Sequence, residues 1–227
     1  YPDLYDPLEN SAGIGEFGLM SGGAWGKKQG EYLGATPTHL MAWSKYKSDG
    51  SLCYKDILSL NGTENTANYN GVVFELPDNI SSNTSSVALY HTTHTNFNTK
   101  IINISGKTKE YFMLENIGHD GYQAGLDYLL GGNDNTSGIA IWHIDDNQSN
   151  NGADVNHKLV DLEEAAEAGM DNSSHSGKQT NLFFSGNKTE FSDSTDPNSK
   201  TYSGTSSGIT IDNISAAGDS MTFDITF

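Results

Sequence analysis

The chain has one cysteine, Cys53, among its 227 residues, so these residues can form no disulfide bond among themselves. In a secreted protein this removes the usual covalent staple, and bound calcium becomes a reasonable substitute. Basic residues are also few, with 12 Lys and Arg against 29 Asp and Glu and a net charge of -17. Because a phosphate backbone requires clustered Lys and Arg, this composition excludes nucleic acid as a partner. It is compatible with divalent cations, with a cationic substrate, or simply with a solvated acidic surface.

Long apolar runs are missing as well. No run approaches the roughly 20 residues that a membrane-spanning helix needs. A chain of 227 residues can bury one sizeable core, or one core and a smaller piece. Cys53 lies between Leu52 and Tyr54 in a predicted strand, and no local signature of a catalytic base accompanies it. We therefore interpret Cys53 as a buried, inert thiol.

The first 23 residues carry the most informative pattern. Tyr1-Pro2-Asp3-Leu4-Tyr5-Asp6 is followed, after a glycine-rich stretch, by Gly18-Leu19-Met20-Ser21-Gly22-Gly23. This pair resembles the immune-inhibitor-A-type family of secreted bacterial zinc metallopeptidases. In that family the motif His-Glu-x-x-His-x-x-Gly runs directly into Pro-Asp-x-Tyr-Asp, and a Leu-Met-Ser-Gly-Gly turn passes beneath the metal. The resemblance implies that Asp3 is the third zinc ligand and that Met20 forms the structural Met turn.

A zinc site of this kind needs more residues than this pattern supplies. Two histidines four apart on one helical face hold the metal, and the glutamate between them acts as general base toward metal-bound water. No His-Glu-x-x-His occurs in the 227 residues, although His91 and His94 stand three apart. The resemblance therefore implies that the chain begins just after this motif and that the isolated chain is inactive. Its partners would be the missing N-terminal part of the catalytic domain and protein or peptide substrates.

Further blocks extend the resemblance over most of the chain. Their order and spacing carry it, since no single block is diagnostic. They are Pro37 to Lys45, Tyr111 to Asn116, Gly121 to Leu126, Trp142 to Asp145, Val160 to Ala165 and Phe191 to Ser199. The resemblance implies a secreted protein, with residues 1–47 as the C-terminal part of a metzincin-like catalytic domain.

Residues 36–47 show the clearest helical pattern. Thr36 is a suitable N-cap and Pro37 suits the first helical position, so we expect a short helix to begin there. Leu40, Trp43 and Lys47 recur at helical spacing, which places an apolar stripe against the core. We interpret His39, within this segment, as a packed or hydrogen-bonded residue and not as a zinc ligand.

Beyond residue 48 the apolar period changes from 3.6 to 2, which predicts strands separated by Gly, Asn and Ser turns. Predicted strands are Val72 to Leu76, Val87 to Thr92, Lys100 to Ile104, Tyr111 to Ile117, Ile139 to Ile144, Ile209 to Ile214 and Met221 to Phe227. The strand at Ile139 is apolar on both faces and should be central, whereas the strand at Met221 alternates and should have one wet face. The pattern predicts a mainly β protein with minor α structure, in which residues 48–227 form a β-sandwich or jelly-roll-like domain.

An acidic segment follows the predicted central strand. Carboxylates at a strand end, an Asn- and Gly-rich loop and a second carboxylate pair could form an oxygen cage for calcium, although the spacing is not that of an EF-hand. The candidate ligands are Asp145, Asp146, Glu163 and Glu164, with Asp154 in reserve. The alternative is a solvated acidic loop beside a short helix at Leu162 to Ala168. We interpret His143, on the strand itself, as a buried histidine bonded to a neighbouring carboxylate.

The sequence leaves three functions open. The first is the C-terminal portion of a secreted zinc endopeptidase that hydrolyses proteins with metal-activated water. The second is a non-catalytic, calcium-stabilised β-sandwich module that binds a glycan or a protein, with Tyr122, Tyr128 and Tyr202 as possible aromatic contacts. The third is a relative that keeps the fold and has lost catalysis. A His-Glu-x-x-His immediately upstream of Tyr1 would decide for the first.

Overall fold

The structure is a computed structural model. It describes residues 3–47, 72–75, 85–90, 98–104, 106–107, 109–118, 123–131, 137–152 and 154–227. The strands are β1 (Val72–Glu75), β2 (Ser85–Tyr90), β3 (Asn98–Asn103), β4 (Glu110–Ile117), β5 (Gly138–Asp145), β6 (Val160–Leu162), β7 (Thr210–Asp212) and β8 (Ser220–Thr226). The α-helices are α1 (Ala42–Lys47) and α2 (Ala124–Leu129). Single 3-10 turns are η1 (Gly15–Phe17), η2 (Gly22–Trp25), η4 (Met170–Asn172) and η5 (Gln179–Asn181).

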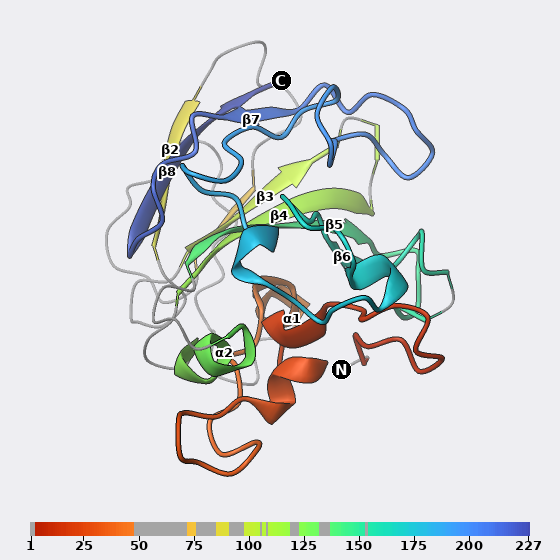
Figure 1. Cartoon of the computed structure of the whole chain (residues 1–227). Helices are drawn as coiled ribbons and strands as arrows, with labels where there is room; N and C mark the ends of the chain where they lie inside the picture. Colours follow the sequence, from red (N-terminus) through yellow and green to blue (C-terminus); the bar gives the residue numbers. More distant parts are fainter. Residues whose placement is uncertain are drawn as a thin grey trace.

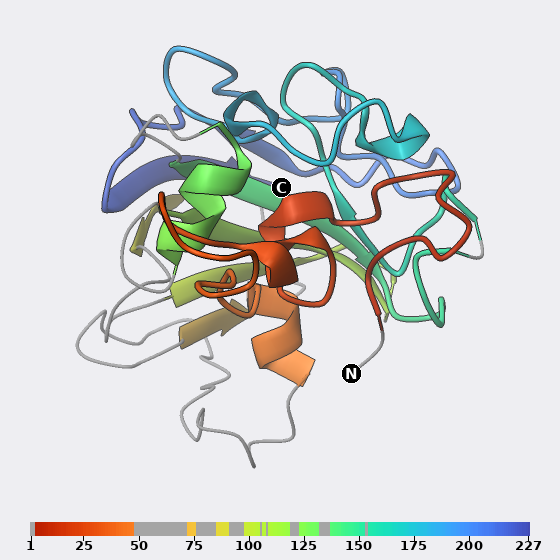
Figure 2. The same ribbon diagram turned by 60° about the horizontal axis from the view of Figure 1, so that its bottom comes forward.

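These strands form two sheets. The larger has the order β1-β3-β4-β5-β6, with β1 parallel to β3 and every other pair antiparallel. The smaller has the order β2-β8-β7 and is antiparallel throughout. Figure 1 shows the smaller sheet above the larger one, with the N-terminal segment and both α-helices below it, and Figure 2 shows this segment and these helices in front of the larger sheet. The protein is therefore mainly β, as predicted, and the larger sheet is covered on both faces.

The upper core lies between the two sheets. Every second residue of β8 points into it, so Met221, Phe223 and Ile225 are buried while the residues between them are exposed or half-buried. Phe112 and Ile141 face them from the larger sheet. The predicted strand with one wet face is confirmed, because alternating burial follows from the two-residue period of a strand.

The lower core lies between the larger sheet and the N-terminal segment. Met113, Trp142 and other downward-facing residues of β4 and β5 join Leu4, Phe17 and Trp43 in one buried cluster. Every position of β5 is buried, which confirms the predicted central strand. Because residues on both sides of position 47 contribute to this cluster, the division into 1–47 and 48–227 runs through a shared core.

A strand of the structure overlaps each of the seven predicted strands between Val72 and Phe227, whereas the predicted helix start at Thr36 is wrong. The strand predicted around Cys53 lies outside the described residues. Helix α1 begins at Ala42, not at Thr36. The N–H groups of Thr36 and Thr38 donate instead to Gly26 O (3.1 Å) and Gly23 O (2.9 Å). The carboxylate of Glu115, on β4, accepts from the N–H of Ala42 (2.9 Å) and so caps the helix from another element. A tertiary contact therefore set the start of this helix.

The helix predicted as one alternative for Leu162 to Ala168 is absent. Leu162 ends strand β6, paired with Trp142, and the N–H of Glu163 continues the pairing by donating to Ile141 O (2.9 Å). The N–H groups of Ala165 and Ala166 then donate to Asn181 O and Thr180 O, both at 3.0 Å. The sequence prediction missed strand β6 and helix α2, which are only three and six residues long. Cys53, His91, His94 and Tyr122 lie outside the described residues.

Candidate functional site

The segment that begins at Asp3 lies directly beside the Met20 turn. The N–H of Leu4 donates to Met20 O (2.9 Å), and the N–H of Ile14 donates to Leu4 O (3.1 Å). Gly13 has a φ of 61°, and a Cβ there would overlap the carbonyl of Leu4, so glycine is required for this close approach. The two motifs singled out in the sequence are therefore joined in space by a backbone hydrogen bond.

Asp6 shapes the turn that follows. Its carboxylate accepts from the N–H groups of Leu8 (2.8 Å), Asn10 (2.9 Å) and Ser11 (3.1 Å), and it is 4% exposed. A carboxylate bound to three backbone donors is a structural capping group. Asp6 is thus committed to holding the loop.

Asn151 fastens this segment to the larger sheet. Its side-chain amide is fully buried and donates to Leu4 O (3.0 Å) and Val160 O (2.7 Å). Its side-chain oxygen accepts from the N–H of Val160 (3.0 Å). One side chain therefore joins the Asp3 segment to β6.

Replacing Asn151 with leucine is expected to lower the free energy of unfolding by about 2 to 4 kcal/mol, because three buried hydrogen bonds are lost while shape is nearly kept. Urea unfolding would measure the change, and hydrogen exchange should rise first around Leu4. Asn150→Leu is the control, since Asn150 is exposed and the bonds of its side chain are local, from Gly152 N–H (2.9 Å) and to the hydroxyl of Ser149 (3.2 Å). Equal destabilisation by both variants would contradict this role.

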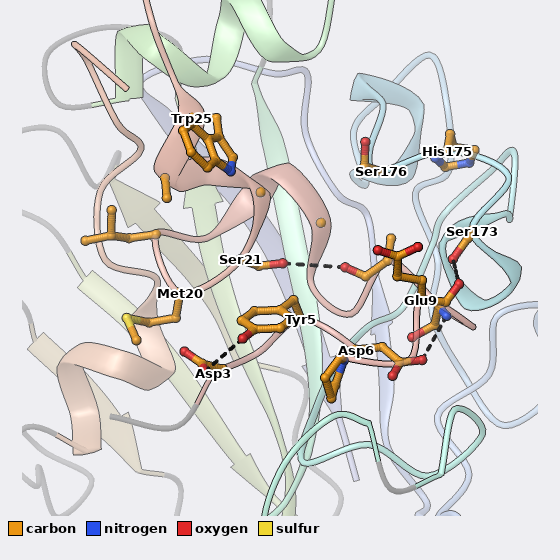
Figure 3. A pocket seen from close by; sticks show the side chains of 17 residues that line it. Asp3, Tyr5, Asp6, Glu9, Met20, Ser21, Trp25, Ser173, His175 and Ser176 are labelled. Carbon is orange, nitrogen blue, oxygen red and sulfur yellow. Dashed lines mark hydrogen bonds between the residues drawn. The ribbon is translucent and has the colours of Figure 1, made fainter. Parts of the chain in front are cut away.

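A cavity of about 720 Å³ opens beside Asp3 and Met20. Figure 3 shows Asp3, Tyr5, Met20 and Trp25 on one side of it, and Ser173, His175 and Ser176 on the other. The described residues that line it are Asp3, Tyr5, Asp6, Pro7, Glu9, Ser11, Ala12, Gly15, Leu19, Met20, Ser21, Gly22, Ala24, Trp25, Ser173, His175 and Ser176. Its volume is that of a typical ligand pocket.

The far wall of this cavity comes from the loop at residues 170–177, more than 140 residues along the chain. Backbone bonds hold it in place: Ala12 N–H donates to Met170 O, and Glu16 N–H donates to Ser176 O, both at 2.7 Å. The hydroxyl of Ser173 also donates to Glu9 O (3.0 Å). Backbone and side-chain hydrogen bonds therefore fix this loop to the N-terminal segment that it faces.

Asp3 is exposed, and its carboxylate accepts a hydrogen bond from the hydroxyl of Tyr5 (3.2 Å). This bond, with the negative charge of Asp3, raises the pKa of Tyr5. Asp3 can offer zinc one carboxylate, and in the described part of the chain no group of three His, Cys, Asp or Glu could hold a metal. These residues alone therefore do not fit a zinc ion, and any complete site needs ligands from outside them.

The candidate calcium ligands do not converge. Asp145 accepts from Asn147 N–H (2.9 Å) and bonds to His157 Nε2 (2.8 Å). Asp146 instead accepts from the ammonium of Lys47 (2.5 Å) and the hydroxyl of Tyr111 (3.2 Å), which ties α1 to the larger sheet.

The second carboxylate pair is also divided. Glu163 bonds to His143 Nδ1 (3.1 Å), whereas Glu164 accepts from the N–H groups of Gly169 and Met170 (3.0 to 3.2 Å). Asp154 is exposed and accepts from Asn156 N–H (2.9 Å). Each of the five carboxylates is therefore engaged by protein donors in a different place, and the calcium cage expected from the sequence is not formed by these residues as they stand.

Sequence reasoning found His143 but not its partners. His143 is 3% exposed, and its Nε2 lies 3.2 Å from Glu110 Oε1 while its Nδ1 bonds to Glu163. Tyr202 stacks on its ring at 4.0 Å, with His157 on the other face of Tyr202 at 4.1 Å. Tyr202 is thus half-buried between two rings and does not serve as the exposed aromatic considered from the sequence.

Charge pairing dominates the titration of this cluster. Burial alone would lower the pKa of His143, but hydrogen bonds and charges from Glu110 and Glu163 raise it to about 9. Burial alone would raise the pKa of Glu110, but hydrogen bonds from His143, the N–H of Tyr202 and Lys107 lower it to about 2. The predicted buried, carboxylate-bonded histidine is therefore confirmed, and it forms an ion pair.

The cluster should give a defined pH dependence of stability. The stabilisation that follows from the raised pKa of His143 is fully present below the unfolded pKa near 6.5, and it is lost as pH rises through about 9. The stabilisation that follows from the lowered pKa of Glu110 is present above about pH 4.5, and it is lost as pH falls through about 2. We therefore expect the difference in free energy of unfolding between the protein and its His143→Gln variant to be largest from about pH 4.5 to 6.5. Urea titrations across pH would measure it, and a difference that does not change up to pH 10 would refute the ion pair.

A second buried ion pair supports the neighbouring loop. The ammonium of Lys158 is inaccessible to solvent and bonds to Asp161 (2.6 Å) and to Asp171. Burial would lower the pKa of Lys158, but the two carboxylates outweigh it and raise that pKa. Burial raises the pKa of Asp161 to about 7 despite the nearby ammonium. Lys158 thereby fixes the start of the loop that forms the far wall of the cavity.

Comparisons of this chain with protein-family models, with curated proteins and with solved structures found no match. The fold and the site thus define a mainly β protein in which two packed sheets support a cavity beside the Asp3 segment. Among the described residues, no helix is both long and apolar enough to span a bilayer.

Proposed function

We propose that the chain is the C-terminal portion of a secreted zinc-dependent endopeptidase of the immune-inhibitor-A type. The observation that carries the proposal is the bond from Leu4 N–H to Met20 O (2.9 Å), which holds the segment that begins at Asp3 against the Met20 turn. Both segments line one cavity large enough for a stretch of peptide. In this proposal Asp3 supplies one zinc ligand, and the other ligands and the general base come from a His-Glu-x-x-His upstream.

The residues of this chain have supporting tasks in such an enzyme. Zinc would supply an acidified water as the nucleophile. Tyr5 orients the Asp3 carboxylate through its hydrogen bond, and Asp6 holds the loop that carries both. The Met20 turn lies beside them in the cavity lining. In this proposal the Asp3 segment and the Met20 turn belong to the end of a metzincin-like catalytic domain, which packs on a β-rich domain.

The test is to combine the chain with the segment encoded immediately before it, add zinc, and assay casein hydrolysis. We expect hydrolysis that depends on zinc and stops when a chelator is added. A correctly folded pair that binds zinc and cleaves no protein would contradict the proposal. So would an upstream segment without His-Glu-x-x-His.

A non-catalytic binding module remains the second candidate. The observation that favours it is the exposure of aromatic rings at the cavity, with Trp25 62% and Tyr5 45% exposed. Exposed aromatic rings at a pocket are typical of ligand contacts. Binding of a glycan or protein to the combined, zinc-loaded protein in the absence of any hydrolysis would decide for this candidate. Elemental analysis of the purified chain tests whether calcium is bound to it.

A further inference from the structure

The cavity beside Asp3 has an unbalanced charge. Asp3, Asp6 and Glu9 contribute carboxylates to its lining, and no lysine or arginine belongs to the described residues that line it. The oxygens of Asp6 are occupied by backbone N–H groups, so Asp3 and Glu9 are the carboxylates able to act on a ligand. Glu9 is exposed and its backbone is fixed by the bond from Ser173 to its carbonyl.

His175, at the far wall, does not balance these charges. The N–H of Gly177 donates to its Nδ1 (3.2 Å), so that nitrogen presents a lone pair. Its Nε2 lies 2.6 Å from Glu167 O and donates to it. These two bonds fit the neutral ring, with the proton on Nε2. The cavity therefore presents a negative field to its contents.

The near wall is aromatic and apolar. Tyr5 and Trp25 expose about half or more of their surfaces, and Leu19 and Met20 lie beside them in the lining. Aromatic faces attract ammonium and guanidinium groups, and apolar surface covers the methylene stem of a long basic side chain. An aromatic wall with nearby carboxylates is suited to a ligand that is apolar along its length and cationic at its end.

We propose that this cavity binds the lysine or arginine side chain of a polypeptide, with the stem against Tyr5 and Trp25 and the cation near Glu9. The inference rests on the proposed function, since it assigns the substrate class of that same site. The volume, about 720 Å³, accommodates such a side chain together with flanking backbone. The overall charge of -17 attracts basic proteins toward the cavity.

The test uses the full chain without zinc and three fluorescein-labelled pentapeptides that differ only in a central arginine, norleucine or glutamate. Fluorescence anisotropy measures the dissociation constants. We expect the arginine peptide to bind at least about 10-fold more tightly than the norleucine peptide. Glu9→Gln and Trp25→Leu should each weaken it by about 3- to 5-fold. Circular dichroism would show that both variants keep the fold.

Glu190→Gln is the matched control, because it removes the same charge from an exposed residue outside the cavity lining. If Glu190→Gln and Glu9→Gln weakened binding of the arginine peptide equally, the contribution of Glu9 would be only general electrostatic attraction to an acidic protein. That result would overturn the proposal. Equal affinity for arginine and norleucine peptides, or no saturable binding, would also overturn it. Peptide binding without zinc-dependent hydrolysis in the combined protein would refute only the protease. Hydrolysis without a preference for basic residues would refute only the basic subsite.

Discussion

Asp3→Ala is expected to lower the zinc affinity of the combined enzyme by more than about 100-fold and to remove casein hydrolysis with it. In the proposed function Asp3 is a metal ligand, and a zinc ion with two protein ligands is held weakly. Asp3 is exposed and its only described side-chain bond is to Tyr5, so its loss should leave the fold intact. Competition with a chelating dye would measure the zinc affinity, and casein cleavage would measure the activity.

Two further variants make this result specific. Tyr5→Phe removes the hydroxyl that bonds to Asp3 at 3.2 Å, and it should cost about 10- to 100-fold in zinc affinity. Asp154→Ala removes an exposed carboxylate that does not line the cavity and should leave both measurements unchanged. If Asp3→Ala retained wild-type affinity for zinc, Asp3 would not be a ligand.

His143→Ala is expected to produce the largest loss of stability, about 3 to 5 kcal/mol. The substitution leaves Glu110 and Glu163 as neighbouring carboxylates without their buried cation. It also empties the space between Phe112, at 4.5 Å, and Tyr202, at 4.0 Å. Urea unfolding at pH 6 would measure the loss at the pH where the ion pair contributes fully.

His157→Ala is the control, because it removes the other ring stacked on Tyr202. Its side chain is 33% exposed, so its bond to Asp145 should contribute about 1 kcal/mol or less. Similar losses for both variants would show that stacking on Tyr202, and not the buried charge of His143, provides the stability. The double variant would reveal coupling between the two rings.

Local sequence patterns predicted the strands well, because a strand that is buried on one face has apolar residues at every second position. The alternation of β8 and the apolar run of β5 gave both their type and their exposure before any contact was known. His143 could be assigned to a buried carboxylate contact, since a histidine on an otherwise apolar strand needs a polar partner. Its partners could not, because Glu110 is 33 residues away and Glu163 is 20 residues away.

Helices were predicted less well because their ends were decided by distant groups. The signals at Thr36 and Pro37 were locally sound, but backbone bonds to Gly23 and Gly26 held these residues out of a helix. Glu115 of β4 provided the cap at Ala42. Similarly, the four carboxylates around the acidic loop are close in sequence, yet each is bound by a different set of protein donors.

The sequence by itself determined a mainly β fold, its central strand and its acidic character. These features follow from composition and short-range period, which are written in neighbouring residues. Only the tertiary structure decided where carboxylates find their partners and which loop closes the cavity. The far wall at Ser173 and His175 is fixed by hydrogen bonds to Glu9, Ala12 and Glu16, residues that no local pattern connects to it. Such contacts depend on how the chain returns over the larger sheet, which is a property of the whole fold.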